Sequence, residues 1–279
     1  MLAHLVLAHD KPKQLQRLVS RLCHKDDHIY IHLDAKAAFH SFEALSSMPG
    51  VHFIRKNIKV VWGEYSIVQA TLNSLMEILG SGNHYSHINI LSGRDYPLQS
   101  ATKIHDFFAE NTGKSFVWYD KIFNDWVHGQ VRIKQYDFGD YGFPGRFAMA
   151  KIVNKVMPAR KLPDGFTAYG RSQWMTLTPE AAEFSLKYIK DHPALERFFR
   201  MTWAVDEVFF QTILCNSPLI DSIVNDNLRY IELDPGFRPV VYNMSHANAL
   251  VNSGKLYARK FDIDLDSGIF DYIDKNAGV

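Results

Sequence analysis

Short apolar runs alternate along this chain with segments whose apolar residues recur at helical spacing. The runs that we expect to form buried strands are residues 4–9, 28–34, 51–55, 87–93 and 116–119. Helical spacing is found at Leu15, Leu18, Val19 and Leu22, and again at Val68, Leu72, Leu75, Met76 and Leu79. This order of strands and helices is typical of a mostly parallel, twisted sheet with helices on both faces. The pattern therefore predicts an α/β fold.

Polar clusters follow three of the predicted strands, at residues 8–10, 32–36 and 91–95. In a parallel sheet, ligands bind beyond the carboxyl ends of the strands, which all lie at one edge. We therefore expect one polar rim. The residues that it would carry are His9, Asp34, Ser92, Gly93, Arg94 and Asp95.

Composition excludes several classes of protein. A chain of 279 residues that is 47% hydrophobic can bury a large core, and we expect one large domain. The net charge of +1 gives no long-range attraction to nucleic acid. Only Cys23 and Cys215 are present, which argues against a disulfide framework and a zinc site. No apolar run approaches the about 18 to 20 residues that span a bilayer, and no signal peptide is visible, so we expect a soluble intracellular protein.

Residues 137–168 differ from the rest of the chain, because they carry several glycines and prolines, five basic residues and little periodicity. Only 147–157 shows a pattern, in which apolar residues are interleaved with Arg146, Lys151 and Lys155. Such a basic amphipathic segment is typical of a helix lying on a membrane surface or of a surface helix packed on the core. Of the two, the pattern favours the packed helix.

Residues 203–214 are expected to form a helix with Asp206 and Glu207 in its first turn, where the helix dipole favours carboxylates. Phe210 and Leu214 would fix this helix to the core. A carboxylate held rigidly at a pocket suits a general base. For Asp206 alone, simple helix capping is at least an equal alternative.

Arg259 and Lys260 stand side by side between Tyr257 and Phe261. Arginine binds phosphate through a planar fork and lysine as a compact point charge, so that the pair could together neutralise a diphosphate. The alternative is a solvated basic turn, which composition alone favours.

Seven short motifs, spread over nearly the whole chain, carry a resemblance to a known family. They are residues 32–36, 62–66 with 69–70, 91–98, 169–174, 206–212, 226–229 and 258–262. In their order and spacing the chain resembles the core-2/I-branching β-1,6-N-acetylglucosaminyltransferase family, glycosyltransferase family 14, which includes the protein xylosyltransferases. It is similar to a bacterial-type member, and residues 137–168 depart most from the family.

The resemblance implies a single GT-A-like domain over residues 1–279. For the insert at 137–168, contact with the acceptor or the membrane is the alternative to a helix packed on the core. The resemblance also implies inverting, metal-independent sugar transfer from a UDP-sugar. Glu207 aligns with the catalytic glutamate of the family, and Arg259 and Lys260 with the pair that replaces the metal. The remaining residues implied are Asp34, Trp62 and Gly63 at the nucleoside, Ser92, Gly93, Arg94 and Asp95 near the sugar, and Arg238 as a further phosphate contact.

Metal independence agrees with two features of the sequence. Asp262, Asp264 and Asp266 lack the following glycine and terminal glutamate of a calcium loop. The His32-x-Asp34 pair offers one carboxylate and reads better as a nucleotide contact than as a metal site. We therefore expect no metal and no cofactor.

The donor sugar is predicted from the segment at Gln173 and Trp174. In the xylosyltransferase branch, an aspartate proposed as the base stands in the corresponding segment, and Gln173 cannot serve as one. The Asp206-Glu207 pair follows the N-acetylglucosaminyl branch, which favours UDP-N-acetylglucosamine, with UDP-xylose or another UDP-sugar as the alternative. Gln173, Trp174 and Asp206 would line the acceptor side of the pocket.

The acceptor is expected to be a surface polysaccharide or a lipid-linked oligosaccharide, because no signal anchor is visible in the chain. This predicts a cytoplasmic protein, peripheral on the inner face of the cell membrane. A different class of function remains open, namely a non-catalytic carbohydrate-binding protein on the same fold.

Overall fold

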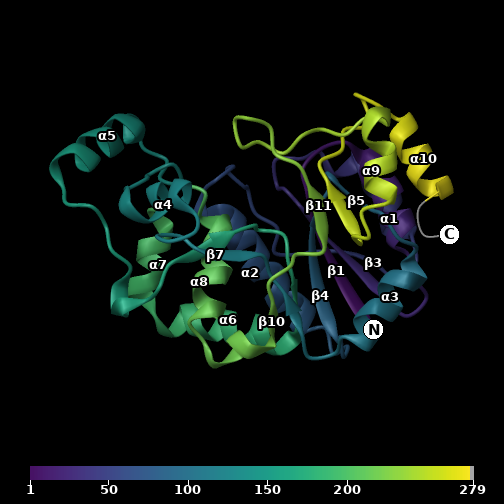
Figure 1. Ribbon diagram of the computed structural model, residues 1–279, viewed down its shortest axis with the longest axis horizontal. Coiled ribbons are helices and arrows are strands. Elements are labelled where there is room, and N and C mark those ends of the chain that lie inside the picture. The colour runs from purple at the N-terminus through teal and green to yellow at the C-terminus, as the bar shows by residue number, and fades with distance from the viewer. Residues whose placement is uncertain (277–279) are drawn as a thin grey trace. The chain divides into compact units, whose positions relative to one another are not determined.

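The computed structural model describes residues 1–276 of the chain (Figure 1). These residues form two compact units. Unit 1 comprises residues 1–55, 83–113 and the chain from 228 onward, and unit 2 comprises residues 56–82 and 114–227. The single domain expected over 1–279 stays a prediction, and its last three residues lie outside the described chain.

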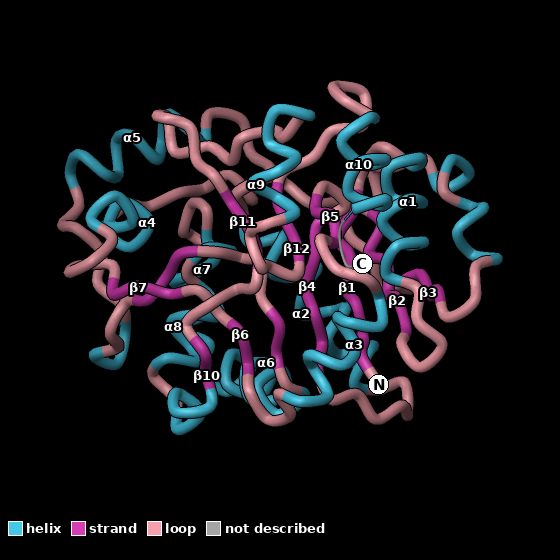
Figure 2. Tube along the Cα trace, turned by 45° about the vertical axis from the view of Figure 1, so that its right-hand side comes forward, coloured by secondary structure: helices cyan, strands magenta, loops and turns pink. Residues whose placement is uncertain are grey.

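Unit 1 is built on four parallel strands in the order β4-β1-β2-β3, which lie side by side in Figure 2. Its helices and strands are β1 (Leu2–Ala8), α1 (Pro12–Leu22), β2 (His28–Leu33), β3 (Val51–Phe53), β4 (His87–Ser92), β5 (Asp95–Pro97), α3 (Ala101–Glu110), β11 (Arg229–Ile231), α9 (Ala247–Val251), β12 (Tyr257–Arg259) and α10 (Gly268–Asn276). The strands predicted at 4–9, 28–34, 51–55 and 87–93 are thus confirmed.

Both faces of this parallel sheet are covered. Every residue of β4 is buried, and in β1 every residue except Leu7 is buried. Because successive side chains point to opposite faces of a sheet, an uninterrupted buried run requires cover on both faces. The amphipathic helix predicted after the first strand is α1, which buries Leu15, Leu18, Val19 and Leu22 as its spacing predicts.

A smaller sheet in unit 1, in the order β11-β12-β5, carries the basic pair near the C-terminus. β12 runs parallel to β11 and antiparallel to β5, and the second pairing sets Arg259 opposite Asp95. Since β5 begins just beyond the carboxyl end of β4, this pairing brings the C-terminal segment to the predicted rim.

Unit 2 contains the remaining elements. They are α2 (Tyr65–Leu79), β6 (Ser115–Phe116), β7 (Tyr119–Lys121), α4 (Gln130–Lys134), α5 (Arg146–Val156), β8 (Tyr169–Arg171), β9 (Thr176–Leu177), α6 (Pro179–Asp191), α7 (Pro193–Arg200), α8 (Phe209–Cys215) and β10 (Ile223–Val224). β6 pairs with β9 and β10, whereas β7 pairs with β8. The expected strand at 116–119 is therefore wrong, because its two ends belong to different sheets and the chain crosses between them at Val117 and Trp118.

The helix expected within the 137–168 insert is α5, but the preference for a helix packed on the core is wrong. Ala150 is its one buried residue, and most of its large apolar side chains are exposed. The helix lies at the edge of unit 2 in Figures 1 and 2. The base of the insert is anchored instead, because the buried Arg160 donates hydrogen bonds to the carbonyl of Gln135 at 2.8 Å and to the hydroxyl of Thr202 at 3.1 Å. Within residues 1–276, no helix is long and apolar enough to cross a membrane.

Candidate functional site

The carboxyl ends of β1, β2 and β4 meet, as the sequence predicts. The amide of Gly93 donates to the carbonyl of Leu7 at 2.9 Å, and the amide of Asp34 donates to the carbonyl of Ala8 at 2.8 Å. A Cβ at position 93 would lie 3.3 Å from the Cβ of Ala8, so this close approach favours glycine. The predicted rim residues that gather here are His9, Asp34, Ser92, Gly93, Arg94 and Asp95.

Two of these rim residues differ in what they can offer a ligand. The buried carboxylate of Asp34 accepts a hydrogen bond from the amide of Lys36 at 2.8 Å and lies 3.5 Å from its ammonium group. Asp34 therefore holds the turn after β2. The side chain of His9 is 65% exposed, and its Nε2 lies 3.6 Å from the carboxylate of Asp10. Its ring is available to a ligand.

Arg94 is held between two carboxylates. Its guanidinium pairs with Asp10 and, at 2.7 Å, with Asp262. Lys11 also pairs with Asp262, at 3.1 Å, and with Asp264. Burial acts against ionisation of Asp262, but the hydrogen bonds from Arg94 and Lys11 outweigh it and lower its pKa to about 2. These acidic groups are thus engaged in ion pairs with basic side chains of the same unit.

Asp95 links the predicted rim to the C-terminal basic pair. Its carboxylate is fully buried and accepts hydrogen bonds from Arg259 Nη1 at 2.8 Å and from the amide of Ser92 at 3.0 Å. A buried carboxylate is stable only when charges and hydrogen bonds compensate it. Asp95 is therefore a structural anchor for Arg259, and its predicted place near the donor sugar stays a prediction.

Lys260 differs from Arg259 in that no carboxylate within residues 1–276 forms an ion pair with it. Its side chain is half-buried. Burial lowers the pKa of Lys260, and the nearby cations Arg259 and Arg94 lower it further. Asp10 and Asp262 act against this lowering, and an anion bound beside Lys260 would likewise relieve both the repulsion and the desolvation of the ammonium group.

Arg238 lies in an exposed turn of unit 1. Its guanidinium is 81% exposed and pairs with Asp234 at 2.8 Å. Two residues further along, the carbonyl of Val240 accepts a hydrogen bond from the amide of Lys260 at 3.2 Å. The backbone that follows Arg238 thus lies beside Lys260. The phosphate-binding role of Arg238 stays a prediction.

In unit 2, Glu207 lies in a short 3₁₀ helix, Val205–Glu207. The single helix expected over 203–214 is wrong in this respect, because α8 begins only at Phe209. The backbone explains the interruption. Ala204 adopts a left-handed conformation with φ 49°, and Val208, with φ −129°, separates the two helices.

The chain around Glu207 is nevertheless firmly fixed. Phe210 and Leu214 are buried in α8, as the sequence predicts. On the other side, Gly170 of β8 lies directly against this turn. A Cβ there would lie 2.7 Å from the carbonyl oxygen of Glu207 and 2.8 Å from Cγ1 of Val208, so only glycine fits.

The carboxylate of Glu207 is oriented by Arg132, whose guanidinium donates to it. The same guanidinium lies over the rings of Trp126 and Trp203, with 4.7 Å and 5.2 Å to the centroids. Burial raises the pKa of Glu207, while Arg132 and Arg171 act against the rise. The ion pair with Arg132 therefore holds the carboxylate in one orientation, and its role as general base stays a prediction.

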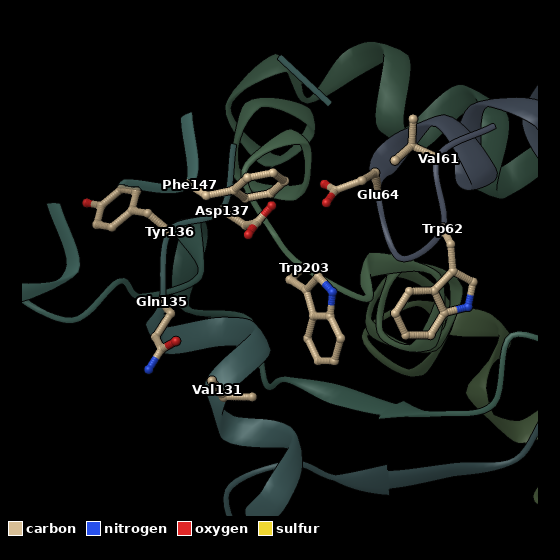
Figure 3. A pocket seen from close by; sticks show the side chains of 9 residues that line it. All are labelled: Val61, Trp62, Glu64, Val131, Gln135, Tyr136, Asp137, Phe147 and Trp203. Atoms are coloured by element: carbon tan, nitrogen blue, oxygen red, sulfur yellow. The ribbon is translucent and has the colours of Figure 1, made fainter. Parts of the chain in front are cut away.

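A pocket of about 500 Å³ lies next to this cluster within unit 2. Trp203 lines it and also contacts Arg132. Figure 3 shows Trp62 and Trp203 on one side and the carboxyl groups of Glu64 and Asp137 pointing toward one another. The full set of lining residues is Val61, Trp62, Glu64, Val131, Gln135, Tyr136, Asp137, Phe147 and Trp203.

The carboxyl group of Glu64 has a raised pKa in this pocket. Burial raises the pKa of Glu64 to about 8, with further contributions from the charge and hydrogen bond of Asp137 and the charge of Asp140. Two close carboxyl groups cannot both ionise readily, so one of them stays protonated near neutral pH. Gly139 is packed against Glu64, since a Cβ there would overlap its carboxyl group.

Trp62 and Gly63, predicted at the nucleoside, belong to unit 2. The ring of Trp62 is 78% exposed and lies edge-on to that of Trp203, with 5.9 Å between the centroids. Gly63 has φ 77°, and its carbonyl accepts the amide of Ala204 at 2.6 Å. The Trp62-Gly63 turn therefore shapes the aromatic pocket.

Of the predicted acceptor residues, Asp206 shares the 3₁₀ helix with Glu207 and is half-buried. Gln173 is buried, and its Nε2 has no hydrogen-bond partner among the described residues. Trp174 is also buried, which places its ring in the core of unit 2. The side-chain amide of Gln173 can therefore still donate a hydrogen bond, whereas the ring of Trp174 is part of the core of unit 2.

Sequence reasoning missed Arg132, Glu64 and Asp137. Arg132 and Glu207 are 75 residues apart, and no local pattern signals their pairing. For Glu64 a signal existed, because it directly follows Trp62 and Gly63 in a recognised motif. A lone acidic residue at the start of a helix is more simply read as a cap, which hides the role in a pocket.

Comparison with known proteins shows which proteins this chain is similar to. The family model described as "Core-2/I-Branching enzyme" matches residues 2–249. Among curated proteins, the xylosyltransferase oxt of Drosophila melanogaster is 27% identical over 222 residues, covering 77% of this chain and 24% of its own length. Xylosyltransferase 2 of Rattus norvegicus is 24% identical over 241 residues, covering 82% and 26%. The chain thus spans about a quarter of the length of these relatives.

Solved structures with a similar arrangement include the galactosyltransferase LgtC in complex with donor and acceptor sugar analogs. It has a TM-score of 0.44 at 7% identity, and the match covers 100% of this chain and 97% of that one. Mouse xyloside xylosyltransferase 1 in its apo form has a TM-score of 0.42 at 10% identity, with 92% and 97% covered.

The mostly parallel α/β architecture and the family match agree. This chain belongs to the core-2/I-branching enzyme family, as the motifs predicted.

Proposed function

We propose that this chain transfers a sugar from a UDP-sugar to a hydroxyl group of a carbohydrate acceptor, with inversion and without a metal ion. The observation that carries the proposal is Lys260, a half-buried cation beside Arg259 and Arg94 that has no carboxylate partner within the described chain. Membership of a glycosyltransferase family supports it.

In unit 1, the ammonium of Lys260 would neutralise the diphosphate. As the bond between the anomeric carbon and the phosphate oxygen breaks, negative charge develops on the departing UDP, and a cation placed in advance stabilises that charge. Arg259 is tied to Asp95 at 2.8 Å, so we assign it the role of positioning Lys260 and adding to the local positive potential. The carboxylates of Asp10, Asp262 and Asp264, which a metal ion at this rim could otherwise use as ligands, form ion pairs with Arg94 and Lys11.

In unit 2, Glu207 would act as the base. Its carboxylate takes the proton from the acceptor hydroxyl, whose oxygen attacks the anomeric carbon from the face opposite the departing UDP. One new glycosidic bond forms, one sugar–phosphate bond breaks, and the configuration inverts. Arg132 would keep the carboxylate aimed at the hydroxyl throughout.

The aromatic pocket would bind the acceptor sugar. The indole ring of Trp62 is 78% exposed and offers a flat apolar face for the C–H face of a sugar ring, and Trp203 lies edge-on beside it. The Glu64–Asp137 pair supplies both a donor and an acceptor of hydrogen bonds for sugar hydroxyls, since it retains one proton.

The donor sugar is N-acetylglucosamine in this proposal, because Gln173 replaces the carboxylate of the xylosyltransferase branch. Xylose is the second candidate, supported by the names of the curated relatives. A screen of UDP-sugars for UDP release, with and without oligosaccharide acceptors, distinguishes the two. Release from UDP-N-acetylglucosamine at the highest kcat/KM supports the first, and preference for UDP-xylose supports the second. No release from any UDP-sugar, together with binding of oligosaccharides, would indicate a non-catalytic carbohydrate-binding protein.

We also propose that α5 contacts the inner face of the cell membrane, in the cytoplasm, where a lipid-linked acceptor or growing surface polysaccharide would lie. Phe147, Ile152 and Val156 are exposed on this helix, next to exposed Lys151 and Lys155. Exposed apolar side chains flanked by lysines are typical of a helix that enters an anionic lipid surface.

We expect the protein to co-sediment with vesicles containing phosphatidylglycerol at low salt, and to release as salt rises. The charge reversals Lys151→Glu and Lys155→Glu together should abolish binding, because each basic residue contributes about 1 kcal/mol near an anionic surface. The matched control is Lys187→Glu with Lys190→Glu on α6, where both lysines are also exposed. Equal loss in both double variants, or no binding by the parent, would rule out a specific contact by α5.

A further inference from the structure

Three side chains with metal-binding atoms meet at the amino end of the parallel sheet in unit 1. His24 follows α1, Asp27 directly precedes β2, and His105 lies on α3. One nitrogen of each imidazole and one carboxylate oxygen of Asp27 all lie within 4.8 Å of one another. The predicted donor rim is at the carboxyl end of the same strands, so this cluster is separate from it.

The spacing of these atoms is close to that of a metal site. His105 Nδ1 lies 2.9 Å from both oxygens of Asp27, and His24 Nδ1 lies 3.5 Å from one of them. Ligand atoms bound tetrahedrally at about 2.0–2.2 Å are about 3.3 Å apart, which is within the observed spread. The two imidazole rings are stacked, with 4.2 Å between centroids, so both present the same edge to Asp27.

The chemical state of the cluster also suits a cation. The Asp27 side chain is 2% exposed, and one of its oxygens is fixed by the amide of Leu2 at 2.6 Å. His24 Nδ1 accepts a hydrogen bond from the amide of Asp26 at 3.3 Å, so this nitrogen carries a lone pair, which a bound ion would take over from the amide.

We propose that His24, Asp27 and His105 bind a divalent transition-metal ion of the Zn²⁺ class. Two imidazole nitrogens and one carboxylate form a typical donor set for Zn²⁺, with a fourth position left to water. The site joins the segment between α1 and β2 to helix α3, which is distant from it in sequence. Its role is structural, and it takes no part in the transfer reaction.

Co²⁺ added to the metal-free full-length protein provides the test, because its visible absorption reports binding and coordination directly. We expect saturable binding of one Co²⁺ per chain, displaced by Zn²⁺, and a rise of the melting temperature with Zn²⁺. The variants His105→Gln and His24→Gln should each weaken Co²⁺ binding by at least about 100-fold, since loss of a ligand exceeds the 10–100-fold effect of losing an outer-shell partner.

Glutamine at position 105 retains an N–H donor for the buried Asp27, so that this variant should keep the fold of the parent, as circular dichroism would verify. The matched control is His40→Gln, an exposed histidine of the same unit, which should bind Co²⁺ like the parent. Absence of saturable binding by the parent would overturn the proposal and leave an Asp27–His105 ion pair alone. Binding that survives both substitutions would overturn it as well, by placing the ion elsewhere.

Discussion

Glu207→Gln lowers the turnover of the preferred UDP-sugar by about 10² to 10⁴-fold, which is the typical effect of losing a general base. Glutamine keeps the size of the side chain and a hydrogen-bond acceptor for Arg132, but it cannot take a proton from the acceptor hydroxyl. UDP affinity, measured by calorimetry, should stay the same because the phosphates are held by Lys260 in this account.

The neighbouring Asp206→Asn variant is the control for Glu207. It removes one carboxylate from the same 3₁₀ helix but leaves the Arg132–Glu207 pair in place, so we expect a far smaller loss of turnover. If Asp206→Asn is inactive while Glu207→Gln turns over within a fewfold of the parent, the base is Asp206.

Lys260→Ala weakens UDP binding by about ten- to hundredfold, because charged hydrogen bonds to phosphate contribute about 1.5–3 kcal/mol. Substitution of Lys260 breaks no ion pair within residues 1–276, so its effect on UDP binding is not mixed with a loss of stability. Arg259→Ala would also leave the buried carboxylate of Asp95 without its 2.8 Å partner and should lower the free energy of unfolding. The matched control, Lys25→Ala, removes one exposed positive charge from the same unit and should bind UDP like the parent.

The pH dependence of UDP binding gives a second test of Lys260. Its pKa is lowered in the free protein, and a bound diphosphate would raise it again. At a pH between the pKa of Lys260 in the free protein and its pKa in the complex, the protein takes up a proton when UDP binds. The affinity for UDP should therefore fall as the pH rises through this range. Calorimetry in two buffers with different ionisation enthalpies measures the uptake. Uptake that is unchanged in Lys260→Ala would show that another group is responsible.

The parallel sheet and its rim could be predicted from the sequence because their signals are local. Apolar runs mark buried strands, and the polar residues that follow them must meet when the strands are parallel and adjacent. The meeting of Gly93 and Leu7, and of Asp34 and Ala8, follows directly from this. The basic pair was also visible, since Arg259 and Lys260 are neighbours in the chain.

The rest depends on contacts that no local pattern reports. The pairing of Arg259 with Asp95 joins residues 164 positions apart. Only the structure shows that this pairing neutralises Arg259 and leaves Lys260 without a carboxylate partner among the described residues. The short 3₁₀ helix before α8 starts after the left-handed backbone of Ala204, a conformation that the residue type does not favour. The exposure of α5 likewise could not be read from its periodicity, because a helix that faces lipid and one that faces a core carry the same apolar stripe.

The most direct test of a cation in place of a metal is turnover of the preferred UDP-sugar in excess EDTA, with the protein verified as folded by circular dichroism. We expect the parent to keep its full rate in the chelator and Lys260→Ala to lose UDP affinity with or without added Mn²⁺. Complete loss of activity in EDTA that Mn²⁺ restores would show that a metal ion, and not Lys260, stabilises the departing UDP.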